Sequence, residues 1–187
     1  MPLTPPEPIH TPRATVRLLE ESDLPGLMAV NGDDKVTRFL PYASWRTLED
    51  AQAWHQRMQG LHQAGTALQF VLLDRATGQP AGTCLLFRHD EGSARAELGY
   101  VLGRAHWGTG LMQEALQGLL ACAFGPLQLR RLEAEVNPAN VASTRLLQRL
   151  GFTREGVLRQ RWVGKGEPYD VVVFGLLSHE FKPAAPR

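Results

Sequence analysis

Three consecutive stretches rich in apolar and β-prone residues constrain the fold of this chain more than any other feature. They cover residues 68–75, 82–89 and 94–103, and the turn-forming sequences ATGQPAG and EGS separate them. Short apolar runs joined by glycine-containing turns are typical of antiparallel strands connected by hairpins. The middle of the chain is therefore expected to form an antiparallel meander.

Helical patterns and further strands surround this meander. A strand at 14–20 is followed by a short helix at 23–31 and a longer one at 47–64. The longer helix opens with Thr47 and Asp50, which have the spacing of a capping box.

The part of the chain after the meander alternates helix and strand. We expect a helix at 111–124 and a strand at 130–136. Asn137 and Pro138 have the pattern of an N-cap followed by proline at the first helical position, and Gly151 would end that helix. Two strands should follow.

These last strands lie near 152–163 and 169–177. The order β-α-α-β-β-β-α-β-α-β-β predicts an α/β sandwich built around a mixed sheet.

Length and composition limit the organisation to one domain. A chain of 187 residues, 43% hydrophobic and 21% charged, can bury a full core. We assign residues 13–181 to a single domain, residues 1–12 to a flexible proline-rich leader and residues 182–187 to a frayed tail. The formal net charge of +1 argues against binding of nucleic acids or membranes through bulk charge.

Cysteine and histidine usage adds two exclusions. Cys84 and Cys122 lie in apolar segments without metal-ligand spacing, so we expect buried free thiols in a reducing cytoplasm. The six histidines show no paired-ligand spacing, so no metal is expected. No apolar run is long enough to cross a membrane.

Two glycines immediately before the helix at 111–124 indicate an anion site. In RAHWGTGLM, Gly108 and Gly110 allow positive φ angles and close approach of a ligand to bare backbone amides. The dipole of the following helix adds partial positive charge, and phosphate is a typical occupant of such a site. The segment lacks the lysine of a Walker A loop and the third glycine of the dinucleotide fingerprint.

Motifs on both sides of this loop carry a family resemblance. AELGYVL precedes it and NPANVASTRLLQRLGF follows it. With these motifs the chain resembles the GNAT superfamily of acetyl-CoA-dependent N-acetyltransferases, and more closely its RimJ/RimL branch. Against the superfamily signature [QR]-x-x-G-x-[GA], Gly110 matches, whereas Trp107 and Met112 depart from the usual residues.

The resemblance implies a GNAT-type fold and acetyl-CoA as co-substrate. Backbone amides of the glycine loop would hold the pyrophosphate, and the pantetheine arm would add like a strand beside the end of the 94–103 strand, where Gly99 would allow a bulge. The next helix would offer polar groups to the pantetheine and the thioester. The cofactor-binding residues implied are Tyr100, Val101, Leu102, Trp107, Gly108, Thr109, Gly110, Leu111, Met112, Asn137, Asn140 and Ser143.

The same resemblance suggests how the acetyl group moves. An amine attacks a thioester only when it is neutral, so a carboxylate that takes its proton is useful, and Glu97 occupies the family's position for that base. The sequence does not fix which way Glu97 points. The tyrosine that many members use as an acid is replaced by Leu147, and Ser143 resembles the serine given that role in the RimJ/RimL branch. Both cysteines are poorly placed for an acyl-enzyme, which favours direct transfer.

Several acceptors stay open at this level. The branch implies the N-terminal α-amine of a ribosomal-type protein, and a small-molecule amine such as an aminoglycoside or a polyamine is the alternative. The resemblance makes Phe39, Tyr42 and Asp170 candidate acceptor contacts. A homodimer is possible.

Two alternatives of another class also stay open. One is a protein that binds CoA without turnover. The other is a nucleic-acid-binding module, because the sequence from 140 to 160 superficially resembles a helix-turn-helix motif. Against the second, Gly151 should stop the helix and β-prone residues follow it.

Overall fold

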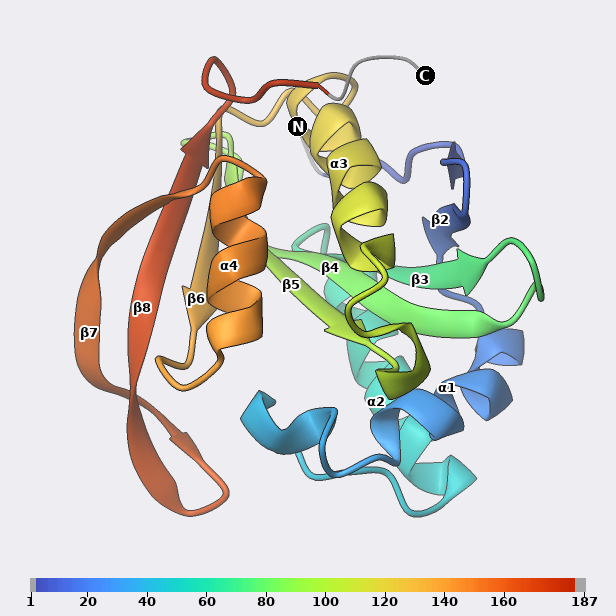
Figure 1. The fold of residues 1–187 in the computed structure, drawn as a ribbon. Coiled ribbons are helices and arrows are strands. Elements are labelled where there is room, and N and C mark those ends of the chain that lie inside the picture. Colours follow the sequence, from blue (N-terminus) through green and yellow to red (C-terminus); the bar gives the residue numbers. More distant parts are fainter. Residues whose placement is uncertain (1–2, 184–187) are drawn as a thin grey trace.

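The computed structural model describes residues 3–183 as one eight-stranded sheet with helices on both faces (Figure 1). The strand order is β1-β2-β3-β4-β5-β6-β8-β7, and every neighbouring pair is antiparallel except β5 and β6. The strands are β1 (Ile9–His10), β2 (Ala14–Leu18), β3 (Leu68–Asp74), β4 (Pro80–Asp90), β5 (Arg95–Leu102), β6 (Arg131–Val136), β7 (Thr153–Gly164) and β8 (Glu167–Leu177).

Four α-helices and three short 3-10 turns connect these strands. The helices are α1 (Leu24–Asn31), α2 (Leu48–Gln63), α3 (Leu111–Phe124) and α4 (Val141–Arg149), and the 3-10 turns are η1 (Glu21–Asp23), η2 (Thr37–Phe39) and η3 (Arg104–His106). The predicted mixed sheet and its meander are thereby confirmed, and the element order is as predicted except for the additional strand β1. The capping box of Thr47 and Asp50 forms at the start of α2 as expected.

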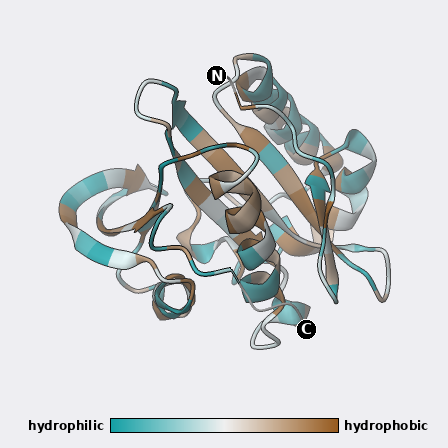
Figure 2. Cartoon of the chain, turned by 90° about the horizontal axis from the view of Figure 1, so that it is seen from above, coloured by the Kyte–Doolittle hydropathy of each residue, from teal (hydrophilic) through white to brown (hydrophobic). Residues whose placement is uncertain are grey.

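Two apolar clusters fill the space between the sheet and the helices. The larger cluster joins α3 and α4 to one face, with Phe70, Leu119 and Phe174 fully buried. The smaller one packs α1 and α2 on the other face, where the rings of Trp45 and Trp54 lie 5.2 Å apart. Figure 2 shows the hydrophobic stretches gathered in the central strands and the hydrophilic ones on outer loops.

Helices α1 and α2 cover only part of their face. They contact β3 and β4, and their cluster reaches β5 through Val101. In Figure 1, α2 passes behind β4 and β5 and α1 lies below them, and none of the four α-helices lies behind β6, β8 and β7. Half of this sheet face is therefore left for polar side chains.

The N-terminal segment is more closely attached than the expected flexible leader. Ile9–His10 form β1 beside β2, and Leu3 is buried in the main core. Ile9 also contacts α3 so closely that a Cβ at Gly118 would lie 2.7 Å from its Cγ2. An isolated Ile-His pair carries too short a pattern to predict a strand. Of the expected frayed tail, residues 184–187 lie outside the described part of the chain.

The chain between 137 and 152 corrects two expectations. Asn137 does not cap the helix: it forms a turn in which its Oδ1 accepts from the amide of Ala139, and Asn140 caps α4 by accepting from the amide of Ser143 at 3.2 Å. Gly151 does end this segment, at a left-handed φ of 93°. Strand β7 follows rather than a second helix, so the helix-turn-helix interpretation is wrong.

Candidate active site

The strands β5 and β6 separate after three residue pairs. Their parallel pairing joins Arg95 with Arg131, Ala96 with Leu132, and Glu97 with Glu133. Beyond Glu97, β5 continues to Leu102 beside β4, and β6 continues to Val136 beside β8. Between the described residues of β5 and β6 no further pairing occurs, so each strand has an open edge toward the other.

This separation does not depend on a bulge at Gly99. The pairing of β5 with β4 is regular from Glu97 to Leu102, with Gly99 opposite Leu85. The irregularity lies on the other side of Glu97, between Phe87 and Asp90 in β4. The expected bulge at Gly99 is therefore absent from this pairing.

Tyr100 connects the open edge of β5 with α4. Its hydroxyl lies 2.7 Å from Oγ of Ser143 in the first turn of α4, and burial raises the pKa of Tyr100 to about 12. The backbone of Tyr100 belongs to the open edge, whereas its side chain reaches α4. The structure thus brings together two predicted residues that lie on different elements.

The glycine loop forms the end of the same region. Gly108 and Gly110 have φ angles of 73° and 81°, in the left-handed region that favours glycine, and Gly110 is the N-cap of α3. Among the described residues, the amides of Gly108, Gly110 and Met112 donate to no protein acceptor. The loop therefore presents unpaired donors at the positive end of a 14-residue helix.

The N-terminal segment fixes this loop from outside. Arg13 Nη1 donates to the carbonyl of Thr109 at 2.9 Å, and Arg13 Nε lies 2.7 Å from Glu114 in the first turn of α3. Thr11 Oγ1 donates to the same carboxylate at 2.7 Å. Sequence reasoning missed this clamp, because nothing links residues 13 and 114 before the fold is known.

Trp107 and Leu102 already interact with each other. The indole Nε1 of Trp107 donates to the carbonyl of Leu102 at 2.8 Å, although the Trp107 side chain is half exposed. That carbonyl is consequently occupied in this structure. The buried side chains of Leu111 and Met112 belong to the core, so only their backbones face the loop.

Glu97 lies at the point where the two strands separate. It is buried, with only 7% of its surface exposed. Ala96 and Leu98 belong to the core under α3 and α4, so the side chain of Glu97 points to the opposite face. Burial raises the pKa of Glu97 above its ordinary value, and the nearby Arg88 opposes that shift. The orientation that the sequence left open is decided by this alternation.

Two further carboxylates share the face of Glu97. Glu133 and Glu135 alternate on β6 with core residues, and both raise the pKa of Glu97. We call Glu97, Glu133 and Glu135 the carboxylate face. Glu133 is held by Arg95 at 3.0 Å and by Arg131 at 2.8 Å.

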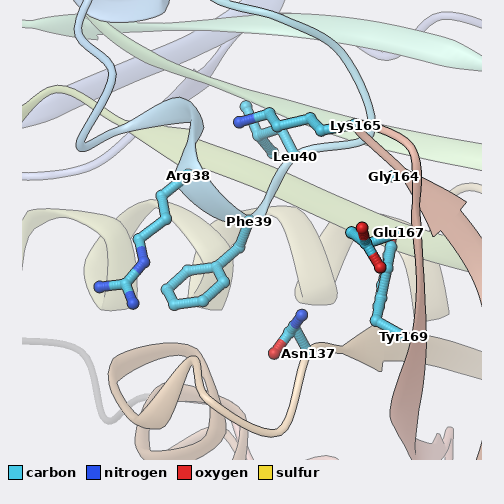
Figure 3. Close-up of a pocket in the computed structure, with 8 residues that line it drawn as sticks. All are labelled: Arg38, Phe39, Leu40, Asn137, Gly164, Lys165, Glu167 and Tyr169. Carbon is cyan, nitrogen blue, oxygen red and sulfur yellow. The ribbon is translucent and has the colours of Figure 1, made fainter.

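A small cavity opens beside the carboxylate face. It has a volume of about 190 Å³ and lies between η2, the turn after β6 and the β7–β8 hairpin. Figure 3 shows Phe39 and Asn137 facing this space, with Tyr169 on the hairpin side. Its lining residues are Arg38, Phe39, Leu40, Asn137, Gly164, Lys165, Glu167 and Tyr169.

The remaining candidates have different surroundings. Tyr42 donates to Oδ1 of Asn31 at 3.2 Å and is not among the residues that line this cavity. Asp170 accepts from the amide of Gln160 at 2.8 Å, which secures the irregular part of β7. Cys84 is fully buried, and burial raises the pKa of its thiol to about 12.

The residues described contain no group of three or more side chains suited to a metal ion. Over the same part of the chain, no helix has the length and apolar character needed to cross a bilayer.

Comparison with known proteins identifies the class of protein. The sequence pattern of the GNAT acetyltransferase domain matches residues 13–153. The chain therefore belongs to the GNAT acetyltransferase family, and it is an N-acetyltransferase similar to the RimJ/RimL branch, as the sequence motifs indicated.

Individual relatives span almost the whole chain. The uncharacterized N-acetyltransferase p20 of Bacillus licheniformis is 37% identical over 94% of this chain and 98% of its own length. The [ribosomal protein uS5]-alanine N-acetyltransferase of Escherichia coli is 28% identical over 94% and 93%. A GCN5-related N-acetyltransferase from Brucella melitensis has a TM-score of 0.85 at 25% identity, covering 96% of this chain and 83% of that one.

The contact between Tyr100 and Ser143 yields a prediction about stability. Tyr100→Phe and Ser143→Ala should each lower the free energy of unfolding by about 1 kcal/mol, because each removes the hydrogen bond between the two hydroxyls. The double variant should lose little more than either single variant, since the two changes remove the same interaction. Urea unfolding measures all three.

Tyr169→Phe is the matched control. The hydroxyl of Tyr169 has no hydrogen bond to the described residues, so its removal should change the free energy of unfolding by less than about 0.5 kcal/mol. Strictly additive losses at Tyr100 and Ser143 would show that their contact contributes nothing.

Proposed function

We propose that this protein transfers an acetyl group from acetyl-CoA directly to a primary amine, and that the preferred acceptor is the N-terminal α-amine of a protein. The observation that carries this proposal is the separation of β5 and β6 with buried Glu97 at its vertex. An open strand edge accepts an extended chain through backbone hydrogen bonds. The arm of acetyl-CoA is such a chain, with amides spaced along it.

The glycine loop fits the diphosphate of the same co-substrate. Unpaired amides at Gly108, Gly110 and Met112 lie at the N-terminus of α3, where an anion is favoured. Arg13 stays near enough to add positive charge, since its Nη2 would lie 3.6 Å from a Cβ at Gly110. Acetyl-CoA supplies the activated thioester carbonyl, and the loop and the open edge hold and orient it.

Glu97 is the proposed base. Its raised pKa makes the carboxylate a better proton acceptor than an exposed glutamate. It takes the proton of the acceptor ammonium, so that a neutral amine can attack. Cys84, buried with a strongly raised pKa, is unsuited to an acyl-enzyme, which favours direct transfer.

Ser143 is proposed to support the leaving thiolate. Its hydroxyl is shared with Tyr100, which supplies a second hydroxyl at the same end of the open edge. A hydroxyl pair can pass a hydrogen bond toward a developing anion without full ionisation of either group. Asn140 supports Ser143 by capping α4, and Asn137 lines the acceptor-side cavity.

The cavity beside the carboxylate face supports a peptide acceptor. It is open between η2 and the β7–β8 hairpin and has a volume of about 190 Å³, which suits one or two small residues. One relative is named as an N-acetyltransferase of an alanine in ribosomal protein uS5, and alanine is a small residue. The lining of the cavity has mixed charge, with Arg38, Lys165 and Glu167. Such a lining does not favour polyamines or aminoglycosides, the polycations of the alternative proposal.

An acceptor panel tests this function. With acetyl-CoA, the protein should release thiol in the presence of peptides beginning with alanine or serine, and mass spectrometry should place the acetyl group on the α-amine. The same peptides with a blocked N-terminus and a free lysine are the control and should give no product. Turnover of spermidine or kanamycin alone would instead support the small-molecule alternative.

A substitution in the glycine loop tests the co-substrate site. Gly110→Asp should raise the Kd for acetyl-CoA at least about tenfold, or about 1.4 kcal/mol, because a carboxylate would repel the diphosphate. Isothermal titration calorimetry measures this change.

Gly78→Asp is the control for backbone strain. Gly78 has a φ of 70° in the β3–β4 turn, so its substitution introduces the same charge and a similar strain far from the loop. An unchanged Kd in the Gly110 variant would remove the loop from the site.

The pH dependence of the rate tests Glu97. In the wild type, kcat/KM should fall as the pH drops through the raised pKa of Glu97, because the protonated carboxyl cannot accept a proton. Glu97→Gln should lower kcat/KM by about 10²- to 10⁴-fold near pH 6 to 7. The loss should shrink toward about pH 9, where an α-amine with a pKa near 8 is already neutral.

Glu133→Gln is the matched control, since Glu133 is the direct neighbour of Glu97 in the parallel pair. Its pH profile should keep the acidic limb, shifted toward lower pH because Glu133 raises the pKa of Glu97. A profile of the Glu97 variant that parallels the wild type would exclude Glu97 as the base.

A further inference from the structure

Arg88 is held in an unusual backbone conformation over Glu97. It has a φ of 50°, in the left-handed region, and follows Phe87 at the irregular point of the β4–β5 pairing. Phe87 is paired with Glu97 and shares its face, so regular alternation would turn Arg88 toward the core on the other side. The bulge brings Arg88 back to the face of Glu97 instead.

The guanidinium of Arg88 lies between a carboxylate and an aromatic ring. Nη1 contacts both oxygens of Glu97, at 3.0 and 3.1 Å, and the guanidinium carbon lies 4.7 Å from the centre of the Trp162 ring. Trp162 is itself fixed, since its indole nitrogen donates to Glu135. A carboxylate and an aromatic face around one position form a site for an organic cation.

This contact has a weaker geometry than a bidentate arginine–carboxylate pair. A single nitrogen of Arg88 serves both oxygens, so the pair lacks the two parallel bonds of the strongest arginine–carboxylate geometry. The Arg88 side chain is 39% exposed, whereas that of Glu97 is 9% exposed. Arg88 can therefore leave toward solvent, but Glu97 stays buried and would need another cation.

The site lies next to the cavity of the proposed acceptor. Tyr169, which lines that cavity, is paired directly with Trp162 across the β7–β8 hairpin. Glu135 accepts from the indole nitrogen of Trp162 and raises the pKa of Tyr169, so this carboxylate is near both side chains. The Trp162 ring, which contacts Arg88 over Glu97, is therefore one cross-strand pair away from the cavity lining.

We propose that Arg88 occupies the position of the acceptor's ammonium group, and that a cationic amine must displace it to reach Glu97. This inference rests on the proposed function and adds the charge state in which the acceptor is recognised. The acceptor enters as an ammonium ion between Glu97 and Trp162. One N–H proton then moves to the Glu97 carboxylate, which leaves a neutral amine and a neutral carboxyl group. Amines that are already uncharged gain nothing from this site.

Binding of a minimal ammonium probe tests the displacement without turnover. Alaninamide is added to the protein in the absence of acetyl-CoA at about pH 6, where its amine is protonated. The indole N–H resonance of Trp162, assigned with Trp162→Phe, reports binding. N-acetylalaninamide has the same skeleton without the charge and should not bind.

Arg88→Asn is the informative variant, because asparagine tolerates a left-handed φ and carries no charge. It should bind alaninamide at least tenfold more tightly than the wild type, since no internal cation competes. Arg88→Lys keeps a cation and should resemble the wild type. Arg95→Ala removes an arginine from Glu133 on the same face and should also leave the affinity unchanged. Equal or weaker binding by Arg88→Asn would overturn the proposal.

A second readout covers the case in which Arg88→Asn is unstable. In Arg88→Gly, the acidic limb of the kcat/KM profile should move to higher pH, because Arg88 opposes the effect of burial and of Glu133 and Glu135 on the pKa of Glu97. An unmoved limb would overturn the proposal. If the wild type releases thiol but Arg88→Asn does not bind alaninamide more tightly, the displacement of Arg88 is rejected and the proposed function stands. If Arg88→Asn binds alaninamide more tightly but the wild type releases no thiol with any acceptor, the proposed function is rejected and the cation site stands.

Discussion

The parallel contact between β5 and β6 ends after Glu97, and the arrangement of the site depends on this. Before that point, three residue pairs tie the two halves of the sheet together. After it, each strand stays with its antiparallel partner, β4 on one side and β8 on the other. The strands can separate without loss of the fold because both remain paired on their outer edges. An open backbone edge within a sheet is thus available to an extended ligand.

The residues around this opening combine rigidity with unmet hydrogen-bonding capacity. The amides of the glycine loop have no acceptor among the described residues, while Arg13 and Glu114 hold the loop from outside. Tyr100 joins β5 to Ser143 of α4 at the opening itself. Such preorganisation matters for acyl transfer, since donors already in place need no reorganisation when charge develops.

The carboxylates on the uncovered part of the sheet differ in how many arginines neutralise them. Glu133 has two arginine partners, whereas Glu97 has one guanidinium, held through a single nitrogen. Burial then favours the protonated form of Glu97 and Arg88 favours the ionised form. Burial is the larger of the two influences, so the pKa of Glu97 stays raised although its cationic neighbour lowers it.

The sequence by itself determined the order of strands and helices, the meander, the glycine loop and the family, because hydrophobic periodicity, turn residues and short motifs are local properties. It also singled out Glu97, Gly110 and Ser143 through their places in motifs. Other features depend on contacts between segments far apart in the chain, and only the tertiary structure decided them. The clamp of Arg13 on Glu114 spans about a hundred residues, and the position of Arg88 depends on one irregular residue in β4. A left-handed φ at an arginine has no sequence signature, since it results from strand register and packing rather than from local preference.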